Sequence, residues 1–439
     1  MSHSLTTSRV GKTLPFAVSL GLLICLYWIV DDRYGQWDFH VFYAAAHALA
    51  EGTNPYVRLH PRPNLSGDSI YQFPPLTIYV FQWTTLLSLA SAKLVWLGLK
   101  LVALSLLAWL WHKDFERLDA GWPIVLFIAL GFNATLLRDI TTGNISTFEQ
   151  LGIWFAFSLL LRDRPYAAAL LLACVAQFKL LPAAFLALIP LVRPQNGIKP
   201  FVVGCAVFLG LLTANQVFSP QLTHNYLSLF LEHYERMDER GVGNPSSLAL
   251  FRDTIDLSAY EPGLSYNRMA GTNAYIAYLV ALALILARAM WQRRARIPKA
   301  EPRLLLYFGC ALYALAMPRM KDYSYVLMLI PTLFVIRDIG RRRTTPEFLL
   351  IAVGLMVWGQ PQQTYVPGLQ ALIYMLQAYL PLLTAAAVMG YVLIISLRAE
   401  VAPKPSHDES AIASQPGRLP EQQPESPALS SQSLSVDLP

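Results

Sequence analysis

Apolar stretches free of charged residues recur along almost the whole chain. A helix that crosses a bilayer needs about 20 mostly apolar residues. The stretches are Leu14–Val30, Ile70–Ala92, Leu101–Trp111, Trp122–Leu137, Leu151–Leu161, Tyr166–Phe178, Leu180–Val192, Phe201–Phe218, Asn273–Ala287, Leu304–Pro318, Tyr323–Ile336, Phe348–Trp358 and Leu369–Leu397. Several are shorter than a full span, which indicates tilted, kinked or re-entrant helices. The pattern predicts an all-α, polytopic membrane protein with about 11 to 13 membrane helices.

Basic residues flank many of these stretches and predict the orientation of the chain, because Lys and Arg concentrate in cytoplasmic loops. Arg9 and Lys12 precede the first stretch, and the dense basic segments Arg288–Arg303 and Arg337–Arg343 flank later ones. We therefore expect an inner-membrane protein whose N-terminus and C-terminal tail are cytoplasmic. For the alternation to hold, one element between Pro74 and Leu161 must not cross fully, and Phe73–Ala90 is the candidate.

The composition narrows the class of protein further. Of the 439 residues, 55% are hydrophobic and only 14% are charged, which excludes a disordered chain or an ordinary soluble domain. The net charge of +6 is scattered between apolar stretches, so we expect the lipid bilayer and no nucleic acid as a partner. The four cysteines show no metal-site or disulfide spacing. Residues 401–439 are rich in Pro and Ser, which predicts a disordered tail after a membrane module at 1–400.

The outward loop that follows the first stretch changes to a helical pattern after Asp38. Phe39 and Phe42 fall on one face of that helix, His40 falls on another, and Gly52 provides a stop. The pattern predicts a short amphipathic helix at the membrane surface. Asp38 at its start has two readings. It is a helix N-cap, for which Asp is a preferred residue, or it is a catalytic carboxylate that deprotonates a sugar hydroxyl.

Three cations stand at helix ends that the predicted orientation places outside, where cations are disfavoured. Lys179 lies between two apolar stretches, and Arg319 and Lys321 lie just before another. A lysine at such a position can snorkel to water, and Arg319 or Lys321 can pair with Asp322. The alternative, which we favour, is that all three bind a phosphate group.

Other polar residues on the predicted outward face are candidates for binding a substrate, although polar loops occur in every membrane protein. They are His40, Tyr71, Asn144, His224, Asn244 and Tyr323. His40 and His47 have a spacing of two helical turns, but a zinc site usually needs three protein ligands, so we expect no metal. Motifs for nucleotide binding, zinc proteolysis or a serine nucleophile are absent, and we expect no cofactor.

Short motifs in a fixed order resemble glycosyltransferase family 87. The resemblance begins at Asp38 and continues through Asn54-Pro55-Tyr56 and Tyr71-Gln72-Phe73-Pro74-Pro75-Leu76. It goes on with Gly143-Asn144, Phe178-Lys179-Leu180-Leu181-Pro182 and Asn244-Pro245-Ser246-Ser247, and covers roughly Trp37 to Ser324. Members commonly carry His before Tyr at the position of Asp322-Tyr323. In this chain, Lys321-Asp322 precedes that Tyr instead.

This resemblance implies a GT-C fold and an enzyme that uses a polyprenyl-phosphate-sugar donor, with a hexose such as mannose as the sugar. The acceptor would be a glycan or a glycolipid on the extracytoplasmic face. Asp38 would be the general base of an inverting transfer, and Lys179 would face the donor phosphate. The main alternative is a secondary transporter or a translocase of lipid-linked sugars. Transporters place ionisable residues near the bilayer midplane, whereas the charged residues of this chain gather at helix ends.

Overall fold

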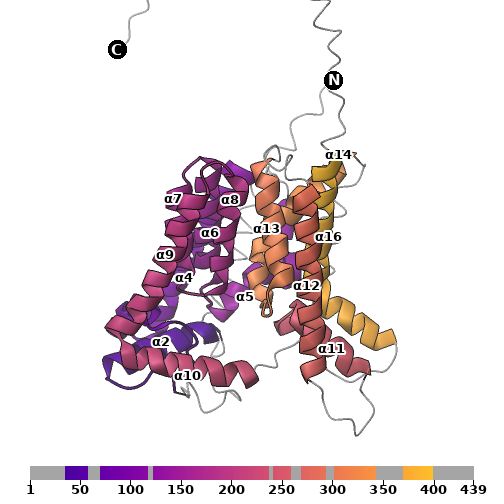
Figure 1. Ribbon diagram of the computed structural model, residues 1–439. Helices are drawn as coiled ribbons and strands as arrows, with labels where there is room; N and C mark the ends of the chain where they lie inside the picture. The colour runs from indigo at the N-terminus through magenta and orange to yellow at the C-terminus, as the bar shows by residue number, and fades with distance from the viewer. Residues whose placement is uncertain are drawn as a thin grey trace, which may run out of the picture. The chain divides into compact units, whose positions relative to one another are not determined.

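The computed structural model describes residues 35–57, 70–116, 122–236, 241–258, 268–292, 301–342 and 369–398 (Figure 1). Every regular element in these ranges is a helix, which confirms the all-α prediction. The chain divides into two units, Met1–Ser396 and Leu397–Pro439. The predicted spans Leu14–Val30 and Phe348–Trp358 and the predicted tail at 401–439 lie outside the described residues.

Four described helices are long and apolar enough to cross a membrane: Leu89–Phe115, Ile198–Phe218, Met269–Arg288 and Met375–Ile395. They correspond to α4 (Leu89–Leu110) with its π-helical extension η2 (Trp111–Phe115), α9 (Ile198–Phe218), α12 (Arg268–Gln292) and α16 (Leu369–Arg398). Shorter apolar helices occupy Ser146–Leu161, Pro165–Val175, Leu181–Val192 and Pro302–Ala316. The chain is therefore a multi-pass membrane protein, and the total of about 11 to 13 spans stays a prediction.

Eight further helices pack into one apolar core with α4 and α16 (Figure 1). They are α5 (Trp122–Thr142), α6 (Ser146–Leu161), α7 (Pro165–Val175), η3 (Leu181–Ala187), α8 (Leu188–Val192), α13 (Pro302–Ala316), η6 (Asp322–Met328) and α14 (Leu329–Arg342). Trp154 of α6 is fully buried, with edge-to-face contacts to Trp111, Phe115 and Phe157. Large aromatic side chains of this kind each bury a large apolar area and so contribute strongly to the packing of the bundle.

Two helices, α2 (Trp37–Ala50) and α10 (Pro220–Arg236), lie across the ends of the upright helices (Figure 1). The short α3 (Pro75–Val80) and η1 (Gln82–Leu86) pack beside α2. Both are too short to cross a bilayer, which confirms that the segment Phe73–Ala90 is no full span. The remaining described elements are η4 (Gly241–Gly243) and α11 (Ser247–Ser258).

Helix α2 is more buried than an amphipathic surface helix would be. Phe42 stacks on Phe81, with ring centroids 4.5 Å apart, and Phe39 stacks on Trp96 at 5.3 Å. His40, which we assigned to the polar face, is buried as well. The predicted stop is confirmed, because Gly52 adopts a positive φ of 73° immediately after the helix. Packing on several sides holds the N-terminal turn of α2, which carries Asp38, in one place.

Candidate active site

The turn between α5 and α6 packs against the first residues of α2. Gly143 has a φ of +70°, a conformation that glycine adopts without strain. The backbone N–H of Gln36 donates to the carbonyl oxygen of Thr141 at 2.7 Å, and Nε1 of Trp96 donates to that of Gly143 at 2.9 Å. These bonds tie the turn to both α2 and α4.

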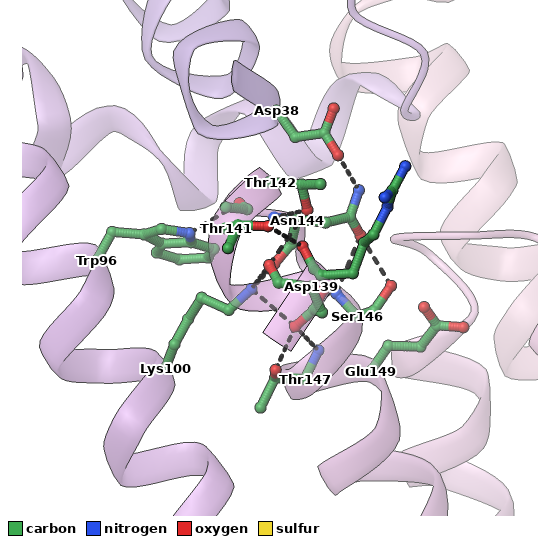
Figure 2. Close-up of polar contacts among 12 residues, drawn as sticks. Asp38, Trp96, Lys100, Asp139, Thr141, Thr142, Asn144, Ser146, Thr147 and Glu149 are labelled. Atoms are coloured by element: carbon green, nitrogen blue, oxygen red, sulfur yellow. Dashed lines mark hydrogen bonds and ion pairs between the residues drawn. The ribbon is translucent and has the colours of Figure 1, made fainter. Parts of the chain in front are cut away.

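Asp38 and Asn144 meet at this junction (Figure 2). Nδ2 of Asn144 donates to Oδ2 of Asp38 at 2.7 Å. Oδ1 of Asn144 accepts from the backbone N–H and the hydroxyl of Ser146, at 3.1 and 2.8 Å. Because the amide oxygen is taken by two donors, the amide nitrogen has to point at the carboxylate. Asn144 therefore orients Asp38.

The N-cap reading of Asp38 is wrong. Helix α2 begins at Trp37, and Gln36 occupies the N-cap position with left-handed backbone angles and no side-chain capping bond. Asp38 lies one residue inside the first turn, where a negative charge still interacts favourably with the helix dipole. The carboxylate of Asp38 thus accepts a hydrogen bond from Asn144, in a distant part of the chain, and does not cap its own helix.

The surroundings of Asp38 act on its affinity for a proton. Burial raises the pKa of the carboxyl above its usual value, while the hydrogen bond from Asn144 and the positive charges of Lys321 and Lys179 oppose that rise. Asp139 adds a smaller upward effect on the same pKa. A carboxylate with a raised pKa is a stronger base than an exposed one, which suits proton abstraction near neutral pH.

Lys179 reaches the same place from the segment before η3. Its Nζ lies 2.6 Å from Oε2 of Glu149 and donates to Oγ of Ser146 at 2.6 Å. The ammonium also lies 5.4 Å from the ring centroid of Tyr323. Lys179, Ser146, Asn144 and Asp38 thus form one hydrogen-bonded chain. The snorkelling alternative does not describe Lys179, because its ammonium is bound to partners inside the protein.

The segment Pro318–Tyr323 carries the other two cations and brings Lys321 to this region. Nη1 of Arg319 donates to Oε1 of Gln72 at 3.1 Å, and the charge of Lys321 acts on Asp38. The charge of Lys321 acts on the neighbouring Asp322 as well, and Asp322 also has a partner from another helix. Nε of Arg138, on α5, lies 2.5 Å from Oδ2 of Asp322. This ion pair anchors the segment Pro318–Tyr323 to α5 at Asp322, the residue between Lys321 and Tyr323.

The remaining candidates divide into supporting and distant residues. Tyr71 is fully buried and shares a hydrogen bond of 2.6 Å with the hydroxyl of Thr77. Oδ1 of Asn244 accepts from the backbone N–H of Met320 at 2.9 Å, so this residue braces the loop with the two cations. His224 is exposed on α10, and among the described residues no hydrogen bond joins it to the Asp38 network.

Sequence reasoning missed three charged residues at this site: Lys100, Asp139 and Glu149. All three are buried, and Lys100 and Asp139 form an ion pair of 2.7 Å. Lys100 lies in the middle of α4, so charges do not all stand at helix ends. The available signal was the closeness of these charges to apolar stretches: Lys100 directly precedes Leu101–Trp111, and Asp139 follows Trp122–Leu137. A charge at membrane depth indicates function by default. No group of metal-ligand residues was found in the described part of the chain.

Replacing Gly143 with Ala should damage this junction. The added Cβ would lie 2.8 Å from Cβ of Gln36 and 2.9 Å from that of Phe39, at a backbone angle that disfavours L-residues. We expect a loss of roughly 1–3 kcal/mol in stability and a clear loss of turnover, because the turn has to move away from α2. Thermal unfolding in detergent and initial rates measure both effects. Gly98→Ala on α4, with open space around it, is the control, and equal behaviour of the two variants would contradict the prediction.

Comparison with known protein families places the chain. Glycosyltransferase family 87 matches residues 71–318, more than half of the chain. The matched segment is shorter than the resemblance from Trp37 to Ser324, and Asp38 lies outside it. No curated protein matches the chain. The match supports a transferase over the transporter alternative. The chain belongs to glycosyltransferase family 87 and is a membrane glycosyltransferase.

Proposed function

We propose that this enzyme transfers a hexose such as mannose from a polyprenyl-phosphate-sugar donor to a hydroxyl of a glycan or glycolipid acceptor. The observation that carries the proposal is the hydrogen-bonded chain from Asp38 through Asn144 and Ser146 to Lys179. It joins a carboxylate that can take a proton to a cation that can receive a phosphate, which are the two groups that such a transfer needs.

In the proposed reaction, the acceptor hydroxyl attacks the anomeric carbon while Asp38 removes its proton. The new C–O bond forms as the bond between that carbon and the phosphate oxygen breaks, and polyprenyl phosphate leaves. A single displacement inverts the anomeric centre. Asn144 occupies Oδ2 of Asp38, so Oδ1 is the oxygen that accepts the proton.

The cations stabilise the negative charge that builds up on the departing phosphate. Lys179 is linked to Asp38 by hydrogen bonds through Ser146 and Asn144, and Lys321 acts on Asp38 through its charge. Arg319, held by Gln72 on the same segment as Lys321, is the third cation proposed to bind the phosphate. The donor is activated by its lipid phosphate, so the proposal includes no nucleotide, metal or other cofactor.

The setting fits a lipid-linked donor. Asp38 lies on α2, which crosses the ends of the membrane helices (Figure 1). A polyprenyl chain would stay in the bilayer while its phosphate reaches this level. With the orientation proposed from the basic loops, this end faces outward, in a GT-C type of arrangement.

A panel of donors tests the proposal. The purified enzyme is incubated with radiolabelled polyprenyl-phosphate sugars, beginning with polyprenyl-phosphate-mannose, and with membrane lipid extract as acceptor. We expect transfer from one lipid-phosphate sugar and none from nucleotide sugars, with inversion seen by NMR of the product. Transfer from a nucleotide sugar, or retention at the anomeric centre, would contradict it.

The pH dependence of the rate should report on Asp38. The carboxylate works only when ionised, and burial raises its pKa, so the rate should fall on acidification at a pH above the ordinary aspartate range. Lys321→Met removes a positive charge that lowers this pKa and should move the acidic limb to higher pH. Lys113→Met, at the far end of α4, is the control. A limb that stays in place, or moves down, argues against Asp38 as the base.

A further inference from the structure

Lys100 of α4 and Asp139 of α5 form an ion pair with no role in the chemistry above. Nζ of Lys100 lies 2.7 Å from Oδ2 of Asp139, and both side chains are 0% exposed. Removing two charges from water is costly, and an apolar pair in the same place is often as stable or more stable. Stability alone is therefore a weak reason for this pair.

The contacts of Lys100 cap the end of one helix. Its Nζ donates to the carbonyl oxygens of Asp139 at 2.6 Å and of Asn144 at 2.5 Å. The last carbonyl groups of a helix lack partners within the helix, and a cation there also complements the dipole. Lys100 thus binds the C-terminal end of α5 and the backbone of Asn144 together.

The contacts of Asp139 cap the beginning of the next helix. Its Oδ2 accepts from the backbone N–H of Thr147 at 3.2 Å and from the hydroxyl of the same residue. Thr147 is in the first turn of α6, where the N–H groups lack partners and a negative charge is favourable. The ion pair therefore joins two caps, one on each side of the turn (Figure 2).

Asn144 is the residue held between these caps. Its backbone carbonyl is bound by Lys100, its Oδ1 by Ser146, and its Nδ2 is the donor to Asp38. A shift of the turn by a fraction of an ångström would change the Asp38 contact, because the amide group of Asn144 is already held at both Oδ1 and Nδ2 and cannot rotate to compensate.

We infer that Lys100 and Asp139 are positioning residues that lock the turn between α5 and α6, and so hold Asn144 where it orients Asp38. The inference rests on the proposed function only for its effect on the rate. Neither residue needs to touch the donor or the acceptor.

The single change Lys100→Met would leave Asp139 buried without its partner and can prevent folding. The test therefore uses the apolar pair Lys100→Met/Asp139→Leu, which removes both charges, and the milder Thr147→Val, which removes one bond to Asp139. The matched control is Glu116→Leu/Arg337→Met, which removes the 3.6 Å ion pair just past the other end of α4.

The first measurement does not depend on turnover. Carbodiimide labels protonated carboxyl groups, and mass spectrometry of Asp38 over a pH series yields the midpoint of its titration. The charged groups that act on Asp38 are Lys321, Lys179, Lys100 and Asp139. The apolar pair removes one charge of each sign, so its main effect comes through Asn144. We expect a midpoint shifted upward, as in Asn144→Ala, a smaller shift in Thr147→Val and none in the control.

The second measurement is a double-mutant cycle on the rate, with polyprenyl-phosphate-mannose as donor and membrane lipid extract as acceptor. We expect the apolar pair to lower kcat roughly 10-fold through misplacement of the base, with KM for the donor unchanged. In the Asn144→Ala background the same replacement should have no further effect. An unshifted midpoint in a folded apolar pair, or equal losses in both backgrounds, overturns the inference. A shifted midpoint together with full turnover by Asp38→Asn would support the positioning role and refute the proposed function.

Discussion

Asp38→Asn is expected to lower kcat by about 10³-fold, within the range for loss of a general base. The amide that replaces the carboxylate keeps nearly the same shape, and its oxygen can still accept the 2.7 Å bond from Asn144. It cannot take a proton from the acceptor. The packing of α2 should therefore persist, and the measurement is the initial rate at saturating donor together with a thermal unfolding curve.

The control for this change is Glu51→Gln at the other end of α2, which also replaces a carboxylate with an amide. Glu51 is exposed, so we expect a rate close to that of the unchanged enzyme. Binding of donor to Asp38→Asn should be nearly normal as well. Turnover by Asp38→Asn within a few-fold of normal would show that Asp38 has a structural role only.

Lys179→Ala is expected to lower kcat/KM for the donor. The loss of transition-state stabilisation should be about 2–3 kcal/mol, the range for truncating one partner of a charged hydrogen bond. A loss of this size corresponds to roughly 30–150-fold. The acceptor that is modified should not change, since Lys179 would meet the donor phosphate. Initial rates over a donor concentration series measure the effect.

Lys179 also neutralises the buried Glu149, so the single change mixes two effects. Lys179→Ala/Glu149→Gln separates them, because it removes the cation without leaving a buried charge. We expect this double variant to fold like the unchanged enzyme and still to use the donor poorly. Recovery of normal kcat/KM in the double variant would mean that Lys179 serves only to neutralise Glu149.

Much of the local structure was already determined by the sequence. Apolar stretches indicate where helices form, since a helix in a bilayer has to present apolar side chains and satisfy its own backbone. Gly52 indicates the end of α2, because only glycine enters that backbone conformation freely. Lys179 stands out because the orientation predicted from the basic loops puts this cation at an outward helix end, where cations are disfavoured. Each signal depends on neighbours within one or two turns of the chain.

Only the tertiary structure decided which of these residues meet. Asp38 and Asn144 are 106 positions apart in the sequence. Arg138 on α5 pairs with Asp322, and many helices lie between them along the chain. Nothing in the sequence connects Lys100 with Asp139, but the packing of α4 on the turn after α5 makes them two caps of one turn. Periodicity specifies the face of a helix and not its partner, so the pairing of buried polar groups follows from how the helices pack.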